Sequence, residues 1–448
     1  MSSIHFIAIG GSVMHTLAIA LHKKGDNITG SDDEIFEPSR SRLAAYNLLP
    51  ESLGWFPEKI TSKLDAVIVG MHARADNPEL LKAQQLGLPI YSYPEFIYEI
   101  AKEKKRIVVA GSHGKTTTTA MILHALAFHQ IPFDYVIGAT PHGFETNVRL
   151  SDAPLIVIEG DEYTTSPTDL TPKFLHYHHH IAVITGIAWD HINVYPDFST
   201  YLQQFSRLIQ QTPKDGLLIY NQTDENVVNL LKEIKDVPQK PYCLHEHVVE
   251  KNITYLITPQ NQKIRVNFFG AHNLQNVSAA KQVCMELNMQ AEKFYEAIQL
   301  FQGTSKRLEL LKTYGKTHLY RDFAHAPSKL TATIQAMKQQ YPMQKLVAVF
   351  ELHTYSSLNK SFLVYYANSM QDADTAIVYY NPKTLTLKRM EMISEEEIRR
   401  AFQRHDLLVF TDSTQLYNYL QNYSWGEDNL LMMSSGNFDN LDIQSIIK

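Results

Sequence analysis

The sequence predicts an α/β protein with three domains. Short apolar runs of the length of buried strands alternate with helical stretches along the whole chain. The chain has 448 residues, which corresponds to about three domains at about 150 residues per domain. Hydrophobic residues make up 44% of the chain and charged residues 20%, as in globular proteins. We place the domains at residues 1–104, 105–303 and 304–448.

The first domain is expected to contain a parallel sheet of the dinucleotide-binding, Rossmann-like type. Its strands are predicted at residues 4–9, 27–29, 66–69 and 89–91. Gly10 and Gly11 end the first strand in a tight turn, and leucines and alanines at helical spacing follow in residues 13–23. Strands separated by helices in this way favour parallel pairing.

The same alternation continues in the other two domains. Strands are predicted at residues 107–110, 155–158, 181–184 and 216–220 in the middle domain, and at residues 345–350, 375–379, 406–410 and 429–433 in the last. We therefore expect the last domain to be Rossmann-like as well. The charged run at residues 101–106 is interpreted as a solvated helix end before the middle domain.

Charge, cysteine content and apolar runs exclude several classes of protein. The formal net charge is −6 and no long basic run occurs, which argues against nucleic-acid binding. Cys243 and Cys284 are too few for a disulfide framework and lack metal-ligand spacing. No apolar run approaches the roughly 18 residues that span a bilayer, and the N-terminus lacks a signal-peptide pattern. We expect a cytoplasmic protein with no membrane partner.

The sharpest motif is a glycine-containing loop between a buried strand and a helix, at residues 108–119. Glycines let backbone N–H groups surround a phosphate, and the helix N-terminus adds partial positive charge. Lys115 is predicted to reach the β- and γ-phosphates, and Thr116 to offer a hydroxyl to Mg²⁺. Val109 stands where longer phosphate loops have their first glycine, which leaves a plain strand–helix turn as the alternative. The flanking elements favour a P-loop ATPase-type domain. The candidate nucleotide-binding residues are Gly111, His113, Gly114, Lys115, Thr116 and Thr117.

Acidic and histidine side chains follow two strands of this domain. Glu159 comes directly after one strand, and His191 follows the next. The carboxyl ends of parallel strands form the ligand crevice of such sheets, and nucleotide-bound Mg²⁺ takes few protein ligands. We predict Thr116, Glu159 and His191 as magnesium ligands, with helix capping as the alternative for the acids. The histidines of residues 176–180 would point to opposite faces of an extended segment, so we expect surface or packed side chains.

The other candidate residues are weaker evidence for a binding site when each is taken singly. Gly10 and Gly11 lack the third glycine of the dinucleotide pattern, so an ordinary turn, NAD and the diphosphate of a nucleotide sugar all stay open. Asn273 lies where a turn enters a helix whose amides can face an adenine. The fork of Arg307 suits phosphate oxygens, and Asp322 can accept hydrogen bonds from ribose hydroxyls. For each alone, a solvated polar surface is the simpler interpretation.

Taken together and in this order, five segments resemble the Mur ligases, the ATP-dependent enzymes that build peptidoglycan peptides. The resemblance covers essentially the whole chain. The segments are Gly10-Gly11 with Ser31-Asp32, residues 111–117, residues 159–162 with Asp190-His191, residues 270–273 with Asn276, and Lys306-Arg307 with residues 322–327.

The resemblance implies a role for each matching residue. It places the UDP end of a sugar nucleotide at Gly10, Gly11, Ser31 and Asp32. It places ATP phosphates and Mg²⁺ at Lys115 and Thr116, and further magnesium ligands at Glu159 and His191. It also places the adenine at Asn273, phosphates at Arg307, the ribose at Asp322 and the incoming amine near His325. The implied catalytic residues are Lys115, Glu159, His191, Arg307 and His325.

The resemblance also implies a reaction, an ADP-forming ligation through an acyl phosphate with ATP and Mg²⁺. The resemblance favours a reaction that joins the tripeptide L-Ala-γ-D-Glu-meso-diaminopimelate to UDP-N-acetylmuramate, as in peptidoglycan recycling. The stretches that favour this reaction are residues 31–38, residues 161–163 with 173–177, and residues 307–309 with 322–325. The nearest alternative is addition of L-alanine to the same acceptor. A nicotinamide-dependent dehydrogenase and a catalytically silent scaffold are further alternatives. We expect a monomer or weak oligomer.

Three departures from the family pattern bear on the choice of substrate. Ala326 replaces the second of two adjacent histidines, and Gly186 stands where an asparagine is usual. Several relatives carry a carbamylated lysine after the Asp-His pair, whereas residues 190–211 contain no lysine.

Overall fold

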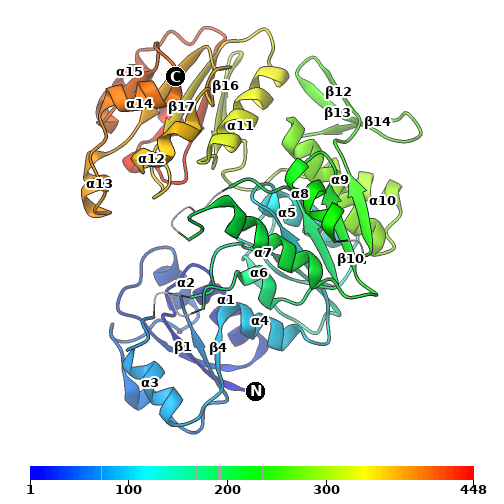
Figure 1. Ribbon diagram of the computed structural model, residues 1–448, viewed down its shortest axis with the longest axis vertical. Coiled ribbons are helices and arrows are strands. Elements are labelled where there is room, and N and C mark those ends of the chain that lie inside the picture. The colour runs from blue at the N-terminus through cyan, green and yellow to red at the C-terminus, as the bar shows by residue number, and fades with distance from the viewer. Residues whose placement is uncertain (72, 167–168, 190–193, 235, 448) are drawn as a thin grey trace. The chain divides into compact units, whose positions relative to one another are not determined.

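The computed structural model describes residues 1–71, 73–166, 169–189, 194–234 and 236–447 (Figure 1). By internal contacts the chain forms two compact units. The first comprises Met1–Ile187, Phe198–Tyr242 and Ala279–Phe294, and the second comprises Ala188–Asp197, Cys243–Ser278 and Tyr295–Lys448. The domain boundaries after residues 104 and 303 stay a prediction.

A four-stranded parallel sheet with the order β2-β1-β3-β4 begins the first unit. Its strands are β1 (Ser3–Ile7), β2 (Asn27–Ser31), β3 (Ala66–Val69) and β4 (Ile90–Ser92). The helices are α1 (Met14–Lys24), α2 (Ser39–Ala45), η1 (Pro57–Lys59), α3 (Pro78–Gln85) and α4 (Tyr93–Ala101). Parallel pairing with intervening helices confirms the Rossmann-like prediction.

The turn after β1 starts earlier than predicted. The strand ends at Ile7 and not at Ile9, because Ala8 has φ +66°, in the left-handed region that favours glycine. The N–H groups of Ala8 and Ile9 both donate to the carbonyl oxygen of Ser31, at 2.9 and 3.1 Å. The turn therefore stays bonded to the end of β2 although it has left the strand conformation.

The middle of the chain forms a seven-stranded sheet with the order β11-β10-β9-β5-β8-β6-β7 (Figure 1). Its strands are β5 (Lys105–Ala110), β6 (Asp134–Val136), β7 (Val148–Arg149), β8 (Leu155–Glu159), β9 (Ile181–Ile184), β10 (Leu217–Asn221) and β11 (Gln239–Tyr242). All neighbours pair in parallel except β6 and β7. The helices are α5 (Lys115–Phe128), α6 (Lys173–His176), α7 (Phe198–Gln210) and α8 (Glu225–Glu233).

A small antiparallel sheet in the second unit was not predicted. It consists of β12 (His247–Glu250), β13 (Ile253–Ile257) and β14 (Lys263–Val266). The helices α9 (Ala271–Glu286) and α10 (Ala291–Ile298) follow along the chain. These strands escaped sequence analysis because most of their residues are exposed or only partly buried, unlike the continuously buried apolar runs of the parallel strands.

The last sheet has the order β15-β16-β20-β17-β18-β19 and is parallel except between β15 and β16. Its strands are β15 (Glu309–Tyr314), β16 (Thr317–Asp322), β17 (Leu346–Glu351), β18 (Thr375–Tyr379), β19 (Leu408–Phe410) and β20 (Asn429–Met433). The helical segments are α11 (Pro327–Gln340), α12 (Lys360–Leu363), η2 (Val364–Tyr366), α13 (Pro382–Leu387), α14 (Glu395–Phe402), α15 (Ser413–Gln421), η3 (Phe438–Asn440) and η4 (Ile443–Ser445). Residues 320–322 form the end of β16.

Both faces of this last sheet are covered, as in other parallel sheets. Ala348 and Phe350 pack into one apolar cluster, while Val347 and Val349, which alternate with them along β17, pack into another. The alternation places one cluster on each face, and this confirms the Rossmann-like prediction for the last domain.

The charged run at residues 101–106 is not simply a solvated helix end. Arg106 is only 7% exposed, and its guanidinium donates to the carbonyl oxygens of Ala101, Lys102, Lys104 and His178. Because three of these carbonyls lie at or just beyond the end of α4, Arg106 satisfies groups that a helix end leaves unpaired.

The segment of residues 176–180 is not extended as predicted, since His176 ends the helix α6, and its histidines contact different partners. His176 Nε2 lies 2.9 Å from Asp169, and the ring of His178 lies 4.5 Å from that of Tyr98. His179 is buried, and burial lowers its pKa to about 3. These side chains are packed singly and do not form one metal site.

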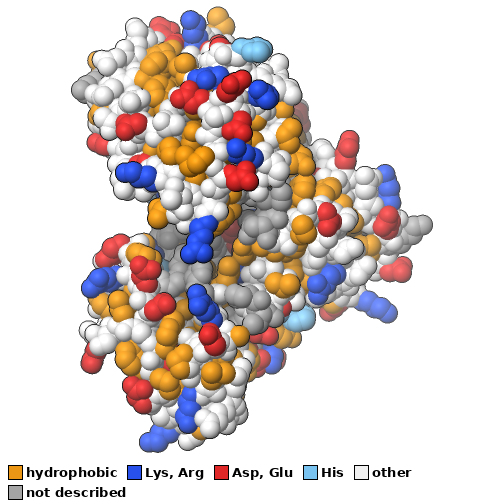
Figure 2. All heavy atoms as spheres, turned by 60° about the vertical axis from the view of Figure 1, so that its left-hand side comes forward, with side chains coloured by type: hydrophobic (Ala, Val, Ile, Leu, Met, Phe, Trp, Pro, Cys, Tyr) orange, Lys and Arg blue, Asp and Glu red, His pale blue; other side chains and the backbone are white. Residues whose placement is uncertain are grey.

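Figure 2 shows one face of the protein, on which lysine and arginine side chains lie among aspartates and glutamates. On the described part of this face the two charge signs are interspersed, which differs from the basic stripe of nucleic-acid-binding proteins. Among the described residues, no helix is both long enough and apolar enough to cross a membrane.

A buried contact between His5 of β1 and Glu79 of α3 provides a test of this fold. His5 and Glu79 are fully buried, with Nε2 and Oε2 3.3 Å apart, and the Phe56 N–H donates to Glu79 at 2.7 Å. Burial raises the pKa of Glu79, but the bonds from His5 and Phe56 help to outweigh this effect, so the pKa lies below its ordinary value.

We expect Glu79→Gln to lower the melting temperature, with a loss of about 1–3 kcal/mol typical of an impaired buried polar group. Because the pKa of Glu79 is lowered, its contribution is complete above about pH 4.3 and is lost as pH falls through the lowered pKa. Thermal melts of both proteins from pH 7 to pH 3 should therefore converge. Glu58→Gln, at an exposed position nearby, is the control. A constant difference across this range would contradict the assignment.

Candidate functional site

The loop between β5 and α5 forms a backbone cradle. Gly111 and Gly114 have φ values of +129° and +75°, in the region that glycine tolerates best. A Cβ atom on Gly111 would lie 2.2 Å from Thr185 Oγ1 and 3.0 Å from the carbonyl oxygen of Gly186, so only glycine fits. Lys115 begins α5 directly afterwards. This close-packed glycine loop before a helix N-terminus fits a phosphate group.

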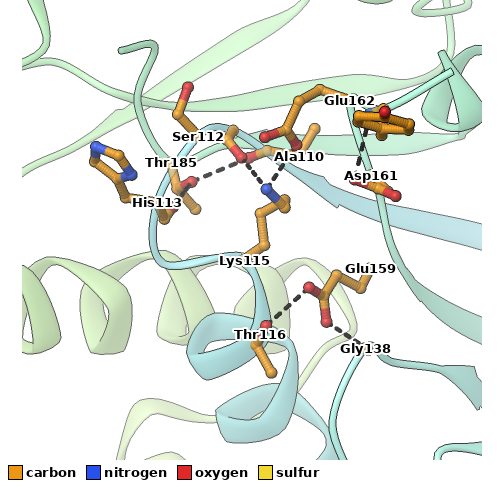
Figure 3. Close-up of polar contacts among 12 residues, drawn as sticks. Ala110, Ser112, His113, Lys115, Thr116, Gly138, Glu159, Asp161, Glu162 and Thr185 are labelled. Atoms are coloured by element: carbon orange, nitrogen blue, oxygen red, sulfur yellow. Dashed lines mark hydrogen bonds and ion pairs between the residues drawn. The ribbon is translucent and has the colours of Figure 1, made fainter. Parts of the chain in front are cut away.

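The end of β9 holds the loop in this conformation. The Ser112 N–H donates to the carbonyl oxygen of Gly186 at 2.9 Å. The Thr185 hydroxyl lies 3.1 Å from the carbonyl oxygen of Ala110 and also contacts that of His113 (Figure 3). Contacts from the two residues after β9 therefore hold the end of β5 and two residues of the loop.

Lys115 is buried beside a carboxylate from a different segment. Its ammonium donates to Glu162 Oε2 at 2.6 Å and to the carbonyl oxygen of Gly111 at 2.7 Å (Figure 3). The side chains of Lys115 and Glu162 are 14% and 1% exposed. Burial alone lowers the pKa of Lys115, but the charges of Glu162 and Asp161 outweigh it and raise the pKa. The lysine is therefore a permanent cation.

Glu159, the last residue of β8, lies beside the first turn of α5. Its Oε1 accepts from the Thr116 hydroxyl at 2.8 Å, and its Oε2 accepts from the Gly138 N–H at 2.7 Å (Figure 3). A hydroxyl and a carboxylate are oxygen ligands of the kind that Mg²⁺ prefers. The structure thus brings together two of the three predicted metal ligands.

The third predicted ligand, His191, lies outside the described residues, as does Asp190. Among the described residues no group of three or more His, Cys, Asp or Glu side chains has metal-site geometry. His113 and Thr117, predicted to bind nucleotide, lie in the loop and in the first turn of α5. Their roles stay predictions.

The predicted sugar-nucleotide residues gather at the carboxyl ends of β1 and β2. Asp32, 6% exposed, accepts from the Gly10 N–H at 2.7 Å, and Gly11 lies in the same turn. Burial raises the pKa of Asp32. The Lys59 ammonium lies 3.4 Å from the Ser31 hydroxyl. A cation therefore lies at this edge, which sequence patterns did not indicate.

In the second unit, Phe323 brings two predicted residues together. The guanidinium of Arg307 lies 4.8 Å from the centre of its ring, and the His325 ring lies 5.3 Å away. His325 Nδ1 is 2.9 Å from the carbonyl oxygen of Phe323. Phe323 was not singled out from sequence, because an aromatic residue beside a strand end resembles an ordinary core residue.

Asp322 and Asn273 are buried and already hydrogen-bonded. Asp322 accepts from the N–H groups of Leu308 and Ala324, at 2.6 and 2.7 Å. Asn273, in the first turn of α9, donates to the carbonyl oxygen of Phe269 at 3.0 Å. Both side chains organise the local backbone, and their predicted contacts with ribose and adenine stay predictions.

Comparison with known proteins identifies the family. Residues 109–284 match the Mur ligase middle domain, residues 3–105 the Mur ligase family catalytic domain, and residues 306–436 the Mur ligase glutamate ligase domain. A UDP-N-acetylmuramate–L-alanine ligase of Sulfurihydrogenibium sp. (strain YO3AOP1) is 30% identical over 448 residues, which cover 98% of this chain and 96% of that protein. The chain belongs to the Mur ligase family. Members of this family are ATP-dependent, ADP-forming amide ligases, and this Mur ligase is an enzyme of that class.

Solved structures of two kinds of Mur ligase resemble this one. The UDP-N-acetylmuramate–alanine ligase of Thermotoga maritima matches with a TM-score of 0.72 at 21% identity, covering 98% of this chain and 97% of that one. The UDP-N-acetylmuramate:L-alanyl-γ-D-glutamyl-meso-diaminopimelate ligase of Neisseria meningitides matches with a TM-score of 0.60 at 26% identity, covering 67% and 98%.

Sequence reasoning located the acidic cluster of the site but missed which acid contacts the lysine. Glu159 is the last residue of β8 and does not follow the strand as expected, and Glu162 lies three residues further on. No spacing rule separates the acid that meets Thr116 from the one that meets Lys115. Thr185 was missed as well, since its contact with the loop depends on the pairing of β5 with β9.

Gly111→Ala tests the cradle. We expect it to weaken ADP binding at least tenfold, because the new methyl group would overlap Thr185 and the backbone would have to move. Equilibrium dialysis with ADP measures the affinity, and circular dichroism checks the fold. Gly143→Ala is a matched control, since Gly143 also has a positive φ, +84°, but open space around its Cβ position. Equal ADP affinity in the wild type and the Gly111 variant would contradict phosphate binding by this loop.

Proposed function

We propose that this Mur ligase joins L-alanyl-γ-D-glutamyl-meso-diaminopimelate to UDP-N-acetylmuramate, using ATP and Mg²⁺, in peptidoglycan recycling. The observation that carries the ATP-dependent step is the buried Lys115 ammonium at the end of a glycine cradle, beside Thr116 and Glu159. Such a group neutralises the charge of a transferring phosphoryl group, the main requirement for its catalysis.

The choice of the tripeptide is supported by residues 161–177. Asp161 accepts from Lys173 at 2.6 Å, and the Lys173 ammonium lies 5.6 Å from the centre of the Tyr163 ring. Two of the stretches that favour the tripeptide, 161–163 and 173–177, thus form one contact cluster next to Glu162. The Neisseria ligase named for this tripeptide matches at 26% identity.

The proposed reaction has two steps. The lactyl carboxylate of UDP-N-acetylmuramate attacks the γ-phosphorus of ATP, and ADP leaves as an acyl phosphate forms. The peptide amine then attacks the acyl carbon and loses a proton, and inorganic phosphate leaves from the tetrahedral intermediate. Lys115 would hold the β- and γ-phosphates. Thr116, Glu159 and His191 would hold Mg²⁺, which neutralises phosphate charge when bound.

The remaining predicted residues bind the substrates in this proposal. Gly10, Gly11, Ser31 and Asp32 would hold the UDP part of the acceptor nucleotide, with Lys59 adding a positive charge at the same strand ends. Arg307 would contact phosphate, and His325 would lie near the incoming amine.

A second candidate is the addition of L-alanine to UDP-N-acetylmuramate. The observation in its favour is the 30% identity, over nearly the full length of both chains, to a ligase named for that reaction. Both candidates use the same nucleotide, the same acceptor and the same acyl phosphate. They differ only in the amine.

Replacing Lys115 tests the phosphoryl-transfer step. We expect Lys115→Ala to reduce turnover by at least about 10³-fold, because developing charge on the phosphoryl group loses its buried cation. ADP release with ATP, Mg²⁺, UDP-N-acetylmuramate and tripeptide measures turnover. Lys240→Ala, which removes a lysine paired with Glu286 away from the loop, should retain wild-type turnover. Near-normal turnover by a folded Lys115 variant would refute the role.

The amine is tested by supplying either the tripeptide or L-alanine to the wild-type enzyme with ATP, Mg²⁺ and UDP-N-acetylmuramate. We expect tripeptide-dependent ADP release with one amide product per ADP, verified by mass spectrometry. Release that depends on L-alanine would establish the second candidate instead. Release with neither amine would reject both.

A further inference from the structure

Glu162 has no role in the reaction described so far, yet it is the carboxylate closest to the critical lysine among the contacts described. It is 1% exposed, and its Oε2 lies 2.6 Å from the Lys115 ammonium. Leaving a carboxylate buried in this way is costly without a cation beside it. The ion pair with Lys115 supplies that compensation.

The segment that carries Glu162 is held from both sides. The Gly160 N–H donates to the carbonyl oxygen of Val109 at 2.8 Å, and the Phe174 N–H donates to that of Asp161 at 3.1 Å. A Cβ on Gly160 would lie 2.7 Å from Val108, so the segment packs closely on β5. The carboxylate therefore has a fixed place near the loop and cannot readily follow a lysine that moves.

Lys115 also makes a hydrogen bond that does not involve Glu162. Its second bond, to the carbonyl oxygen of Gly111, lies within the phosphate loop itself. An ammonium has three donors, so a phosphate in the cradle can take the donor now used by Glu162. A phosphate bound to this ammonium would also lie close to the Glu162 carboxylate, and the two negative charges repel each other at low dielectric.

We propose that Glu162 is the resident counter-ion of Lys115: it holds the ammonium in the nucleotide-free enzyme and competes with phosphate for it. Glu162 is then a positioning residue that weakens nucleotide binding and promotes ADP release after each turnover. The inference rests on the proposed ATP site. It assigns to one acid of the cluster a role distinct from that of Glu159, which contacts Thr116 and not the lysine.

Binding of ADP with Mg²⁺, measured by titration calorimetry, tests this competition. We expect Glu162→Gln to bind ADP about tenfold more tightly than wild type, because the side chain keeps its size but loses the charge that opposes phosphate. Glu162→Asp retains the charge and should stay within about threefold of wild type. The dissociation rate of a fluorescent ADP analogue should fall in the glutamine variant in proportion to the affinity.

Asp161→Asn is a matched control. It removes the same charge one residue away, but the Asp161 carboxylate bonds to Lys173 at 2.6 Å and is 40% exposed. We expect a change in ADP affinity of less than threefold. If Asp161→Asn raised the ADP affinity as much as Glu162→Gln, the net negative charge near the loop, and not competition for Lys115, would set that affinity.

A double-mutant cycle with Lys115→Met tests whether Glu162 affects ADP binding through Lys115. On that background, Glu162→Gln should change ADP affinity by less than twofold, and it should raise the melting temperature that Lys115→Met has lowered. Weaker or unchanged ADP binding in the single Glu162→Gln variant would overturn the competition. Failure of the wild type to bind ADP at all would instead reject the proposed ATP site, so the two failures are distinguishable.

Discussion

The parallel pairing of β5 with β8 and β9 is the constraint on which the candidate site depends. Val109 lies opposite Glu159 in one register, and Ala110 lies opposite Ile184 in the other. Three segments therefore leave the sheet at the same level: the glycine loop, the acidic segment and the turn at Thr185. A shift of one residue in a register would reverse the side-chain faces. In the β5–β8 register it would separate Lys115 from Glu162, and in the β5–β9 register it would separate the loop from Thr185.

Each acid of the candidate site has a hydrogen-bonding partner of its own. Lys115 bonds to Glu162, Lys173 bonds to Asp161, and the Thr116 hydroxyl bonds to Glu159. Each acid thus has a separate partner although all three belong to one four-residue segment. This arrangement fixes the cation and the hydroxyl in advance, so less reorganisation is required when a phosphate arrives. In our proposal phosphate competes only for the Lys115–Glu162 bond, so Glu162, and not Asp161, opposes nucleotide binding.

Continuous apolar runs allowed the parallel strands to be predicted from sequence. Those at residues 66–69, 181–184, 375–379 and 429–433 occur as predicted, because a strand buried on both faces has few polar positions. The antiparallel sheet of β12–β14 was missed, since few of its residues are fully buried and its pairing is not encoded in a local run. At the site, Lys115, Thr116 and Glu159 follow from motif spacing. Glu162 and Thr185 do not, because their contacts are set by the strand register.

The structure gives a physical reason for Gly186, one of the departures from the family pattern. Gly186 has φ +149°, and a Cβ there would lie 2.9 Å from Asp224 Oδ2. Asp224 is engaged on both sides, since its Oδ2 accepts from the Ile187 N–H at 3.0 Å and its Oδ1 caps α8 through Val227. A side chain at position 186 is therefore excluded as long as Asp224 occupies this place.

The contact of Gly186 with the phosphate loop is made by its backbone, through the carbonyl oxygen that accepts from the Ser112 N–H. Loss of a side chain at this position leaves that contact intact. The departure is thus coupled to the cap of α8 and is compatible with an intact cradle for phosphate. Any effect on the reaction would have to come from the absent side chain itself and not from a distorted loop.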